Sequence, residues 1–183
     1  IVDTAIPMVG PWSQEFFHWF ADYLPRLRQI EQLYGSVNNA PPLLIPSNAP
    51  NWLQSSLDLL GVDEENRIQW HGGRMNVRQF VIPSLPRHVE STKPDAGYIQ
   101  SPRAMEWVSS QLRSAVDMSN RPDVGRRLYV SRANQSDRRV INEANLCSVL
   151  SSHGFDIIYP ENWSLEEQVA TFAQSEAVCG PHG

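Results

Sequence analysis

The chain has 183 residues, of which 41% are hydrophobic, and its formal net charge at pH 7 is −5. This length is enough to bury the core of one large domain or of one and a half domains. The acidic balance argues against general binding to nucleic acid or to an anionic membrane surface, because the long-range field has the wrong sign. The sequence contains no apolar run of the roughly 18 residues that a membrane-spanning helix needs, so we expect no membrane span.

The first segment with a clear pattern, 12–34, is rich in aromatic residues and predicts one amphipathic helix with most of its aromatic side chains in the core. His18 and Asp22 are four residues apart, so they share a face of this helix. An imidazole oriented by a carboxylate can act as a general base, and either member of the pair is a candidate for that role. The alternative is a buried, hydrogen-bonded pair with a structural role.

The middle of the chain predicts a further α/β unit. Its expected elements are a strand at 43–45, a helix at 52–60, strands at 67–70 and 77–82, and a helix at 101–116. The proline-rich segment 83–100 is expected to be a long loop, either with a functional role or as an irregular connection. The polar segment 119–126 contains both proline and glycine, and predicts a hinge between an N-terminal domain, 1–118, and a second domain, 127–183.

The segment 127–183 alternates short β-rich runs with helical patterns. Strands are expected at 127–130, 155–159 and 177–179. Asn142 is a candidate N-cap for a helix that ends before Gly154, and Ser164 with Glu167 forms a capping box for a second helix. The expected buried positions of the two helices are Leu146, Val149 and Leu150, then Leu165, Val169, Phe172 and Ala173. Such short connections require right-handed crossovers and predict a doubly wound parallel sheet.

The two cysteines, Cys147 and Cys179, fall on the first of these helices and on the last strand. We interpret both as reduced thiols of the core. This indicates a reducing, cytoplasmic setting, and leaves a peripheral position at a membrane open.

The ends of the predicted strands carry residues suited to an anion. Ligands of parallel α/β sheets bind beyond the carboxyl ends of the strands, where Arg132 follows the first strand and the glycine-bracketed segment 180–183 follows the third. A guanidinium pairs with phosphate at two points, and Gly180 lets the backbone approach a ligand beside the imidazole of His182. We therefore predict a phosphate-bearing ligand at this edge.

The basic residues of the chain are almost all arginine. Lys93 is the one lysine among 15 basic residues. The arginines at 121, 126, 127, 132, 138 and 139 lie within one stretch of 19 positions. Such a cluster favours a diphosphate ligand. The alternative is that most of these side chains are solvated or pair with Asp123, Asp137 and Glu143.

A set of ordered motifs resembles a known family. The motifs are His-Trp and Leu-Pro-Arg-Leu within 18–27, Tyr-Val-Ser-Arg (129–132), Arg-Arg-Val-Ile-Asn-Glu (138–143), Gly-Phe (154–155), Tyr-Pro-Glu (159–161), Glu-Gln (167–168) and Gly-Pro-His-Gly (180–183). Together they are similar to glycosyltransferase family 61, which includes bacterial capsular polysaccharide biosynthesis proteins and eukaryotic GlcNAc- and xylosyltransferases. The resemblance spans most of the chain.

The resemblance implies a GT-B-like fold of two Rossmann-like domains, a nucleotide-diphosphate sugar donor, a glycan or polysaccharide acceptor, and an inverting reaction without a cofactor or an obligatory metal. The absence of an Asp-x-Asp pair agrees with a metal-free route. Arg132, Arg139 and His182 are the candidates for neutralising the diphosphate. Glu167 and Gln168 match a family motif and are candidates for the donor site, although capping could be the whole role of Glu167, as of Asn142.

The family's Gly-Pro-His-Gly element continues into further strands and helices, so we expect the chain to be truncated inside the donor domain and inactive by itself. Two other classes are considered. A Rossmann oxidoreductase would need Gly-x-Gly-x-x-Gly after the first strand, and Ser131-Arg-Ala-Asn does not match it. A non-catalytic nucleotide- or glycan-binding module derived from a transferase is the stronger alternative.

Overall fold

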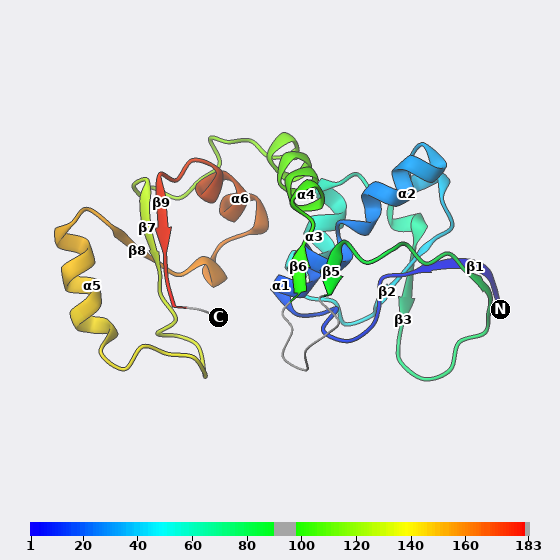
Figure 1. Ribbon diagram of the computed structural model, residues 1–183, viewed down its shortest axis with the longest axis horizontal. Coiled ribbons are helices and arrows are strands. Elements are labelled where there is room, and N and C mark those ends of the chain that lie inside the picture. The colour runs from blue at the N-terminus through cyan, green and yellow to red at the C-terminus, as the bar shows by residue number, and fades with distance from the viewer. Residues whose placement is uncertain (90–97, 182–183) are drawn as a thin grey trace. The chain divides into compact units, whose positions relative to one another are not determined.

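The computed structural model describes residues 1–89 and 98–181 of the chain (Figure 1). The chain forms two compact units, Ile1–Ser114 and Ala115–Gly183, called the N-terminal and the C-terminal unit below. Both units combine helices with a parallel sheet, so the fold is a Rossmann-like α/β fold, as the sequence predicts.

The N-terminal unit is built on a four-stranded parallel sheet with the order β3-β2-β1-β4. Its strands are β1 (Val2–Pro7), β2 (Leu43–Pro46), β3 (Arg67–Trp70) and β4 (Val77–Phe80). The predicted strands at 43–45, 67–70 and 77–82 are confirmed, whereas sequence reasoning missed β1. This strand joins the sheet together, because its first four residues pair with β4 and its last two residues pair with β2.

The aromatic segment does not form the single helix that the sequence predicts over 12–34. It contains α1 (Phe16–His18), the π-helical turn η1 (Trp19–Tyr23) and α2 (Arg26–Tyr34). The amide of Leu24 donates to the carbonyl of Trp19, one residue further back than in an α-helix, and Pro25, which has no N–H, separates the turn from α2. Gly35 ends α2 with a φ of 79°.

The aromatic side chains of this segment divide into two groups. Trp19 and Tyr23 are buried in the core with Leu24 and Leu27. Trp12, Phe16 and Phe17 are exposed, so the prediction that most of the aromatic residues are core is wrong for these three.

The rest of the N-terminal unit consists of short elements around this sheet. They are the turns η2 (Val37–Asn39) and η3 (Glu64–Asn66), the helices α3 (Asn51–Leu59) and α4 (Pro102–Ala115), and the antiparallel strands β5 (Arg87–Val89) and β6 (Tyr98–Gln100). Both helices confirm the sequence prediction. The prediction of a loop over 83–100 is wrong at 87–89 and 98–100, which are strands. The centre of this segment lies outside the described residues.

The C-terminal unit has a three-stranded parallel sheet with the order β8-β7-β9. Its elements are β7 (Arg127–Val130), α5 (Glu143–Ser152), β8 (Asp156–Ile158), the turn η4 (Pro160–Asn162), α6 (Leu165–Ala173) and β9 (Ala177–Cys179). Figure 1 shows α5 and α6 on opposite sides of the strands, so the predicted parallel sheet with crossover helices is confirmed.

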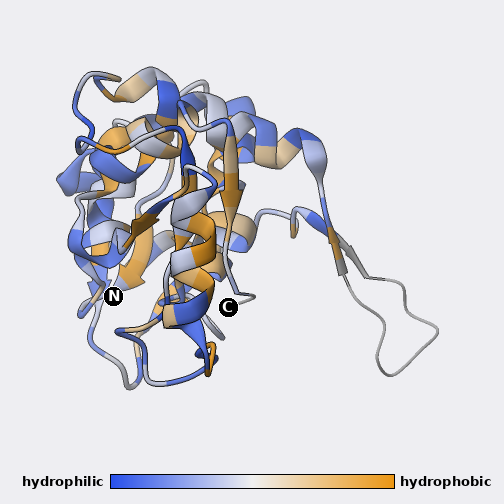
Figure 2. Cartoon of the chain, turned by 90° about the vertical axis from the view of Figure 1, so that its left-hand side faces the viewer, coloured by the Kyte–Doolittle hydropathy of each residue, from blue (hydrophilic) through white to orange (hydrophobic). Residues whose placement is uncertain are grey.

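The core of the C-terminal unit is small, and α5 contributes little to it. Leu128, Ile158 and Leu165 are buried, but 56% of Val149 is exposed. Figure 2, in which α5 is nearest the viewer, shows apolar residues on the side of this helix that is turned outward. The predicted buried positions at Val149 and Ala173 are therefore wrong. Cys147 and Cys179 are free thiols and are half-buried, not fully in the core.

The helices of the structure are short. The longest helix among residues 1–89 and 98–181 is α4, with 14 residues, and within these ranges none has the length and apolar character to span a bilayer.

Candidate functional site

The parallel sheets place the polar motifs of each unit at the carboxyl ends of the strands. In the C-terminal unit, β7 is the first strand in sequence but lies between β8 and β9. The chain direction across the sheet therefore reverses between β7 and β9, and such switch points are where parallel α/β sheets bind ligands. Arg132 follows β7 at this point and Gly180 follows β9.

Arg132 has donors that the protein does not use. One terminal nitrogen of its guanidinium contacts Oδ1 of Asp137 at 3.3 Å. Its Nε is buried and has no hydrogen-bond partner among the described residues. A buried donor without a partner is costly, and a turn of the side chain toward an anion at the switch point would satisfy it.

Gly180 allows the ends of β7 and β9 to approach each other closely. A Cβ on this residue would lie 2.9 Å from the carbonyl oxygen and 3.2 Å from the Cβ of Val130. A side chain would therefore push β9 away from the end of β7. His182, the predicted imidazole of this edge, lies outside the described residues.

A buried carboxylate fixes the backbone where Arg132 begins. Oε1 of Glu143, the first residue of α5, accepts hydrogen bonds from Tyr129 Oη at 3.0 Å, Ser131 Oγ at 3.0 Å and the Arg132 amide at 3.2 Å. Burial tends to raise the pKa of Glu143, but these three donors and the charge of Arg139 outweigh it and lower the pKa below its ordinary value. Burial and the carboxylate raise the pKa of Tyr129 to about 12.

Several of the clustered arginines hold their own unit together. Arg121 binds the carbonyls of Val124 and Gly125, Arg126 binds the carbonyl of Gln174, and Arg127 binds the carbonyl of His153. Arg139 is exposed. Arg138 is exposed as well. The predicted cluster therefore leaves Arg132, Arg138 and Arg139 as guanidinium groups that could meet a ligand, and the sequence motifs single out Arg132 and Arg139.

The motif residues on α6 have structural contacts. The capping box is confirmed, because the Glu167 carboxylate accepts from the Ser164 amide at 2.7 Å while Ser164 Oγ accepts from the Glu167 amide at 3.2 Å. The Gln168 side chain donates to the carbonyl of Trp163 at 3.3 Å. Asn142 is at the N-cap of α5, but its side chain makes no cap bond.

The N-terminal unit brings His18 and Asp22 into direct contact. Nδ1 of His18 is 2.8 Å from Oδ2 of Asp22 across the junction of α1 and η1. Asp22 is 4% exposed, and the β5–β6 hairpin supplies its other partners. Arg87 contacts Oδ2 at 3.4 Å, and the Gln100 amide donates to Oδ1 at 3.1 Å. Sequence reasoning missed these two residues, which lie 65 and 78 positions away.

The ring of His18 is held on its faces but keeps one free nitrogen. Trp12 stacks on it with the ring centroids 5.1 Å apart, and Phe17 meets it edge-on at 5.4 Å. Its Nε2 has no hydrogen-bond partner in the described part of the chain. Trp12 has a φ of 59°, a left-handed conformation that costs energy for a bulky residue.

Arg26 attaches this pair to the sheet. Its Nε donates to the carbonyl of Asp22 at 2.9 Å and a terminal nitrogen donates to the carbonyl of Pro7, the last residue of β1, at 3.3 Å. The guanidinium also lies 4.3 Å from the centroid of the Tyr23 ring. Burial lowers the pKa of Arg26. The His18–Asp22 pair is thereby tied to the carboxyl end of β1.

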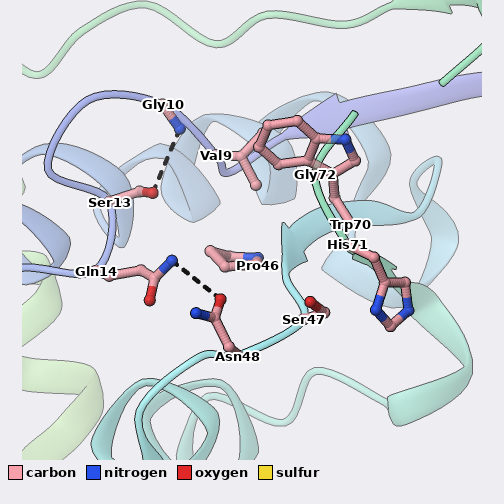
Figure 3. Close-up of a pocket in the computed structure, with 10 residues that line it drawn as sticks. All are labelled: Val9, Gly10, Ser13, Gln14, Pro46, Ser47, Asn48, Trp70, His71 and Gly72. Carbon is pink, nitrogen blue, oxygen red and sulfur yellow. Dashed lines mark hydrogen bonds between the residues drawn. The ribbon is translucent and has the colours of Figure 1, made fainter. Parts of the chain in front are cut away.

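The same end of this sheet contains a pocket of about 650 Å³ (Figure 3). Its lining comes from the carboxyl ends of three strands and the loops that follow them. The lining residues are Val9, Gly10, Ser13 and Gln14 after β1, Pro46, Ser47 and Asn48 at β2, and Trp70, His71 and Gly72 at β3. The sequence had suggested for His71 no more than a place in a turn.

The fold and these sites define a Rossmann-like α/β protein with its polar residues at the carboxyl ends of parallel strands. The chain belongs to glycosyltransferase family 61, because the family model described as Glycosyltransferase 61 matches residues 16–183. Membership in this family supports a glycosyltransferase, an enzyme that acts on a sugar donor and an acceptor. Searches of curated proteins and of solved structures returned no match.

Proposed function

We propose that the protein is an inverting, metal-independent glycosyltransferase of the GT-B type, which moves a sugar from a nucleotide-diphosphate donor to a glycan or polysaccharide acceptor. In this proposal 127–183 belongs to the donor domain, 1–118 to the acceptor domain, and 119–126 is the hinge. The observation that carries the proposal is the buried, unpartnered Nε of Arg132 at the β7–β9 switch point, in a chain of this family.

The donor diphosphate is assigned to the carboxyl ends of β7 and β9. Arg132 binds the phosphates, with Arg139 adding positive charge and Gly180 allowing close approach of the backbone. His182 completes the proposed set, with Glu167 and Gln168 at the start of α6 as further donor-site candidates. Two guanidinium groups could neutralise the charge of the leaving diphosphate without a metal.

The general base is assigned to His18, and Asp22 is its orienting partner. Both oxygens of Asp22 have partners and the residue is buried, so the carboxylate has little access to a substrate hydroxyl. A carboxylate that accepts the Nδ1 proton of His18 leaves the lone pair on Nε2, the nitrogen without a partner. The stacked Trp12 ring holds the imidazole in that orientation.

The proposed reaction is a single nucleophilic displacement at the anomeric carbon of the donor sugar. Nε2 of His18 removes the proton of an acceptor hydroxyl as its oxygen attacks the anomeric carbon of the donor sugar. The bond from that carbon to the phosphate oxygen breaks, and its electron pair leaves with the nucleoside diphosphate. Attack on the face opposite the leaving group inverts the anomeric configuration.

The test is sugar transfer by the product of the complete gene, assayed with UDP- and GDP-activated sugars in the presence and absence of EDTA. The proposal expects a product of inverted configuration, formed at a rate that EDTA leaves unchanged. Loss of transfer in EDTA that Mn²⁺ or Mg²⁺ restores would overturn metal independence. Binding of UDP or GDP without transfer from any donor would favour the non-catalytic module instead.

A further inference from the structure

The pocket at the carboxyl ends of β1, β2 and β3 has no permanently charged side chain in its lining. Among its ten lining residues there is no lysine, arginine, aspartate or glutamate. A phosphate or a carboxylate bound there would lose hydration without gaining a lysine or an arginine, and His71 is the one lining side chain that can carry a positive charge, so an anion is disfavoured. The volume of about 650 Å³ lies within the range of roughly 300–1,000 Å³ that is usual for small-molecule sites.

The polar groups of the pocket suit hydroxyl groups. The Gln14 side-chain amide donates to Oδ1 of Asn48 at 3.2 Å. This bond orients both amides and leaves Oε1 of Gln14 and the NH2 of Asn48 without partners in the part of the chain that the structure describes. One free acceptor beside one free donor group matches a sugar hydroxyl, which both donates and accepts hydrogen bonds.

The opposite side of the pocket is aromatic. Figure 3 shows Trp70 and His71 across the pocket from Gln14 and Asn48, with Pro46 between the two sides. The indole of Trp70 is held by a hydrogen bond from its Nε1 to the carbonyl of Gly73 at 3.3 Å. A fixed aromatic ring with a polar edge opposite is suited to a ligand with one apolar and one hydroxylated side, as the C–H face and the rim of a pyranose provide.

The pocket wall continues into the segment of His18. Ser13 and Gln14 lie five and four residues before His18. This run is a series of hydrogen-bonded turns, in which the Ser13 amide donates to the carbonyl of Gly10 at 3.2 Å and the Glu15 amide donates to that of Trp12 at 2.9 Å. Gly10 itself donates to Ser13 Oγ at 3.3 Å. The wall and the proposed base are therefore parts of one ordered segment.

We infer that this pocket binds an uncharged sugar residue of the acceptor, and that it discriminates against uronic acids and other anionic sugars. That the bound sugar belongs to the acceptor rests on the proposed function, whereas the preference for a neutral pyranose rests on the pocket itself. The lining residues include no arginine, the side chain proposed to bind the diphosphate in the C-terminal unit.

Saturation-transfer NMR and calorimetry with methyl β-D-glucopyranoside, methyl β-D-xylopyranoside and methyl β-D-glucuronide test this inference. The two neutral glycosides are expected to bind, and the glucuronide to bind at least tenfold more weakly. Asn48→Ala and Trp70→Ala should each weaken the neutral glycosides about tenfold, which is the loss of about 1.4 kcal/mol of binding free energy. Trp163→Phe, in the C-terminal unit, is the control and should leave binding unchanged.

A gain of specificity sharpens the test. Gln14 is exposed, so Gln14→Arg should fold normally, and the added guanidinium should increase glucuronide affinity at least fivefold. Equal binding of neutral and anionic glycosides by the unchanged protein, or neutral binding that Asn48→Ala and Trp70→Ala do not weaken, would overturn the inference. Neutral glycoside binding by a protein that transfers no sugar would instead count against the proposed function, and leave this inference standing.

Discussion

Among the residues that the structure describes, each unit buries one carboxylate near the carboxyl end of its first strand, and the two carboxylates have different surroundings. Asp22 in the N-terminal unit contacts an imidazole, a guanidinium and an amide. Glu143 in the C-terminal unit accepts hydrogen bonds from two hydroxyls and a backbone amide. Two partners of Asp22, Arg87 and Gln100, come from distant parts of the chain, whereas those of Glu143 lie within 14 residues of it.

We expect the two carboxylates to have different roles: Asp22 to assist proton transfer, and Glu143 to stabilise the fold. Asp22 orients a group that can exchange a proton and that still has a free nitrogen. Glu143 attaches the start of α5 to the end of β7 and fixes the backbone from which Arg132 extends. Four sets of substitutions test this distinction.

The largest expected effect is on the His18–Asp22 pair. His18→Ala should lower kcat for sugar transfer by about 10²- to 10⁴-fold, because it removes the general base, with little effect on nucleotide binding. Added imidazole should restore part of the activity. Asp22→Asn should reduce kcat similarly, since it favours the wrong tautomer, but imidazole should not rescue it. Both are measured as initial rates with the product of the complete gene.

His153→Ala is the matched control for this prediction. His153 is an exposed imidazole whose Nδ1 lies 2.9 Å from a backbone carbonyl in the C-terminal unit. Its replacement should leave transfer unchanged. Full activity of His18→Ala would show that the pair is structural, and would remove the distinction between Asp22 and Glu143.

The second effect concerns the anion site. Arg132→Ala should weaken UDP or GDP binding by about 10- to 100-fold, because charge-assisted hydrogen bonds to the diphosphate are lost. Arg132→Lys should recover part of that loss, since a lysine keeps the charge but not the two-point geometry. Arg126→Ala is the control, as this side chain pairs with Glu176 at 3.4 Å on the surface. Calorimetry that finds equal losses for Arg132→Ala and Arg126→Ala would contradict the switch-point site.

The smallest effect is expected for Glu143→Gln. This substitution should destabilise the C-terminal unit by about 1–2 kcal/mol, because hydrogen bonds to a charged acceptor are replaced by hydrogen bonds to a neutral one. The folded-state pKa of Glu143 is lowered from an ordinary value of 4.5. The carboxylate therefore contributes stability above about pH 4.5, and this contribution is lost as the pH falls through the lower folded-state pKa. Hydrogen exchange of peptides covering β7 and α5 should show the difference between the two proteins shrink below that pH.

Tyr129 sets the upper pH at which the hydrogen-bonded cluster around Glu143 is stable. Its pKa is raised from 10.0 to about 12, so the stability that its hydroxyl contributes is present below pH 10 and is lost as the pH rises toward 12. Tyr129→Phe should lack this alkaline loss while Arg127→Ala, the control, retains it.

A pH-independent difference between the wild type and Glu143→Gln would show that the Glu143 charge is not what holds β7 to α5.

The sequence by itself determined most of the C-terminal unit. Three short strands, two helices and the Ser164–Glu167 capping box follow from patterns that repeat over a few residues, and the structure has them within one or two positions of the predicted bounds. These features depend on backbone propensities and on hydrogen bonds between near neighbours, which a sequence shows directly. The burial of Val149 was misjudged because the periodicity marks an apolar face and does not show what covers it.

Tertiary structure alone decided how the remaining parts of the sites are assembled. Sequence periodicity did not identify β1 as a strand, did not bring Arg87 and Gln100 to Asp22, and did not gather three loops into a pocket around Gln14 and Trp70. Each of these depends on contacts between residues tens of positions apart. Such contacts are set by the order of strands in a sheet and by the path of the chain between them, and no local pattern of residues specifies either.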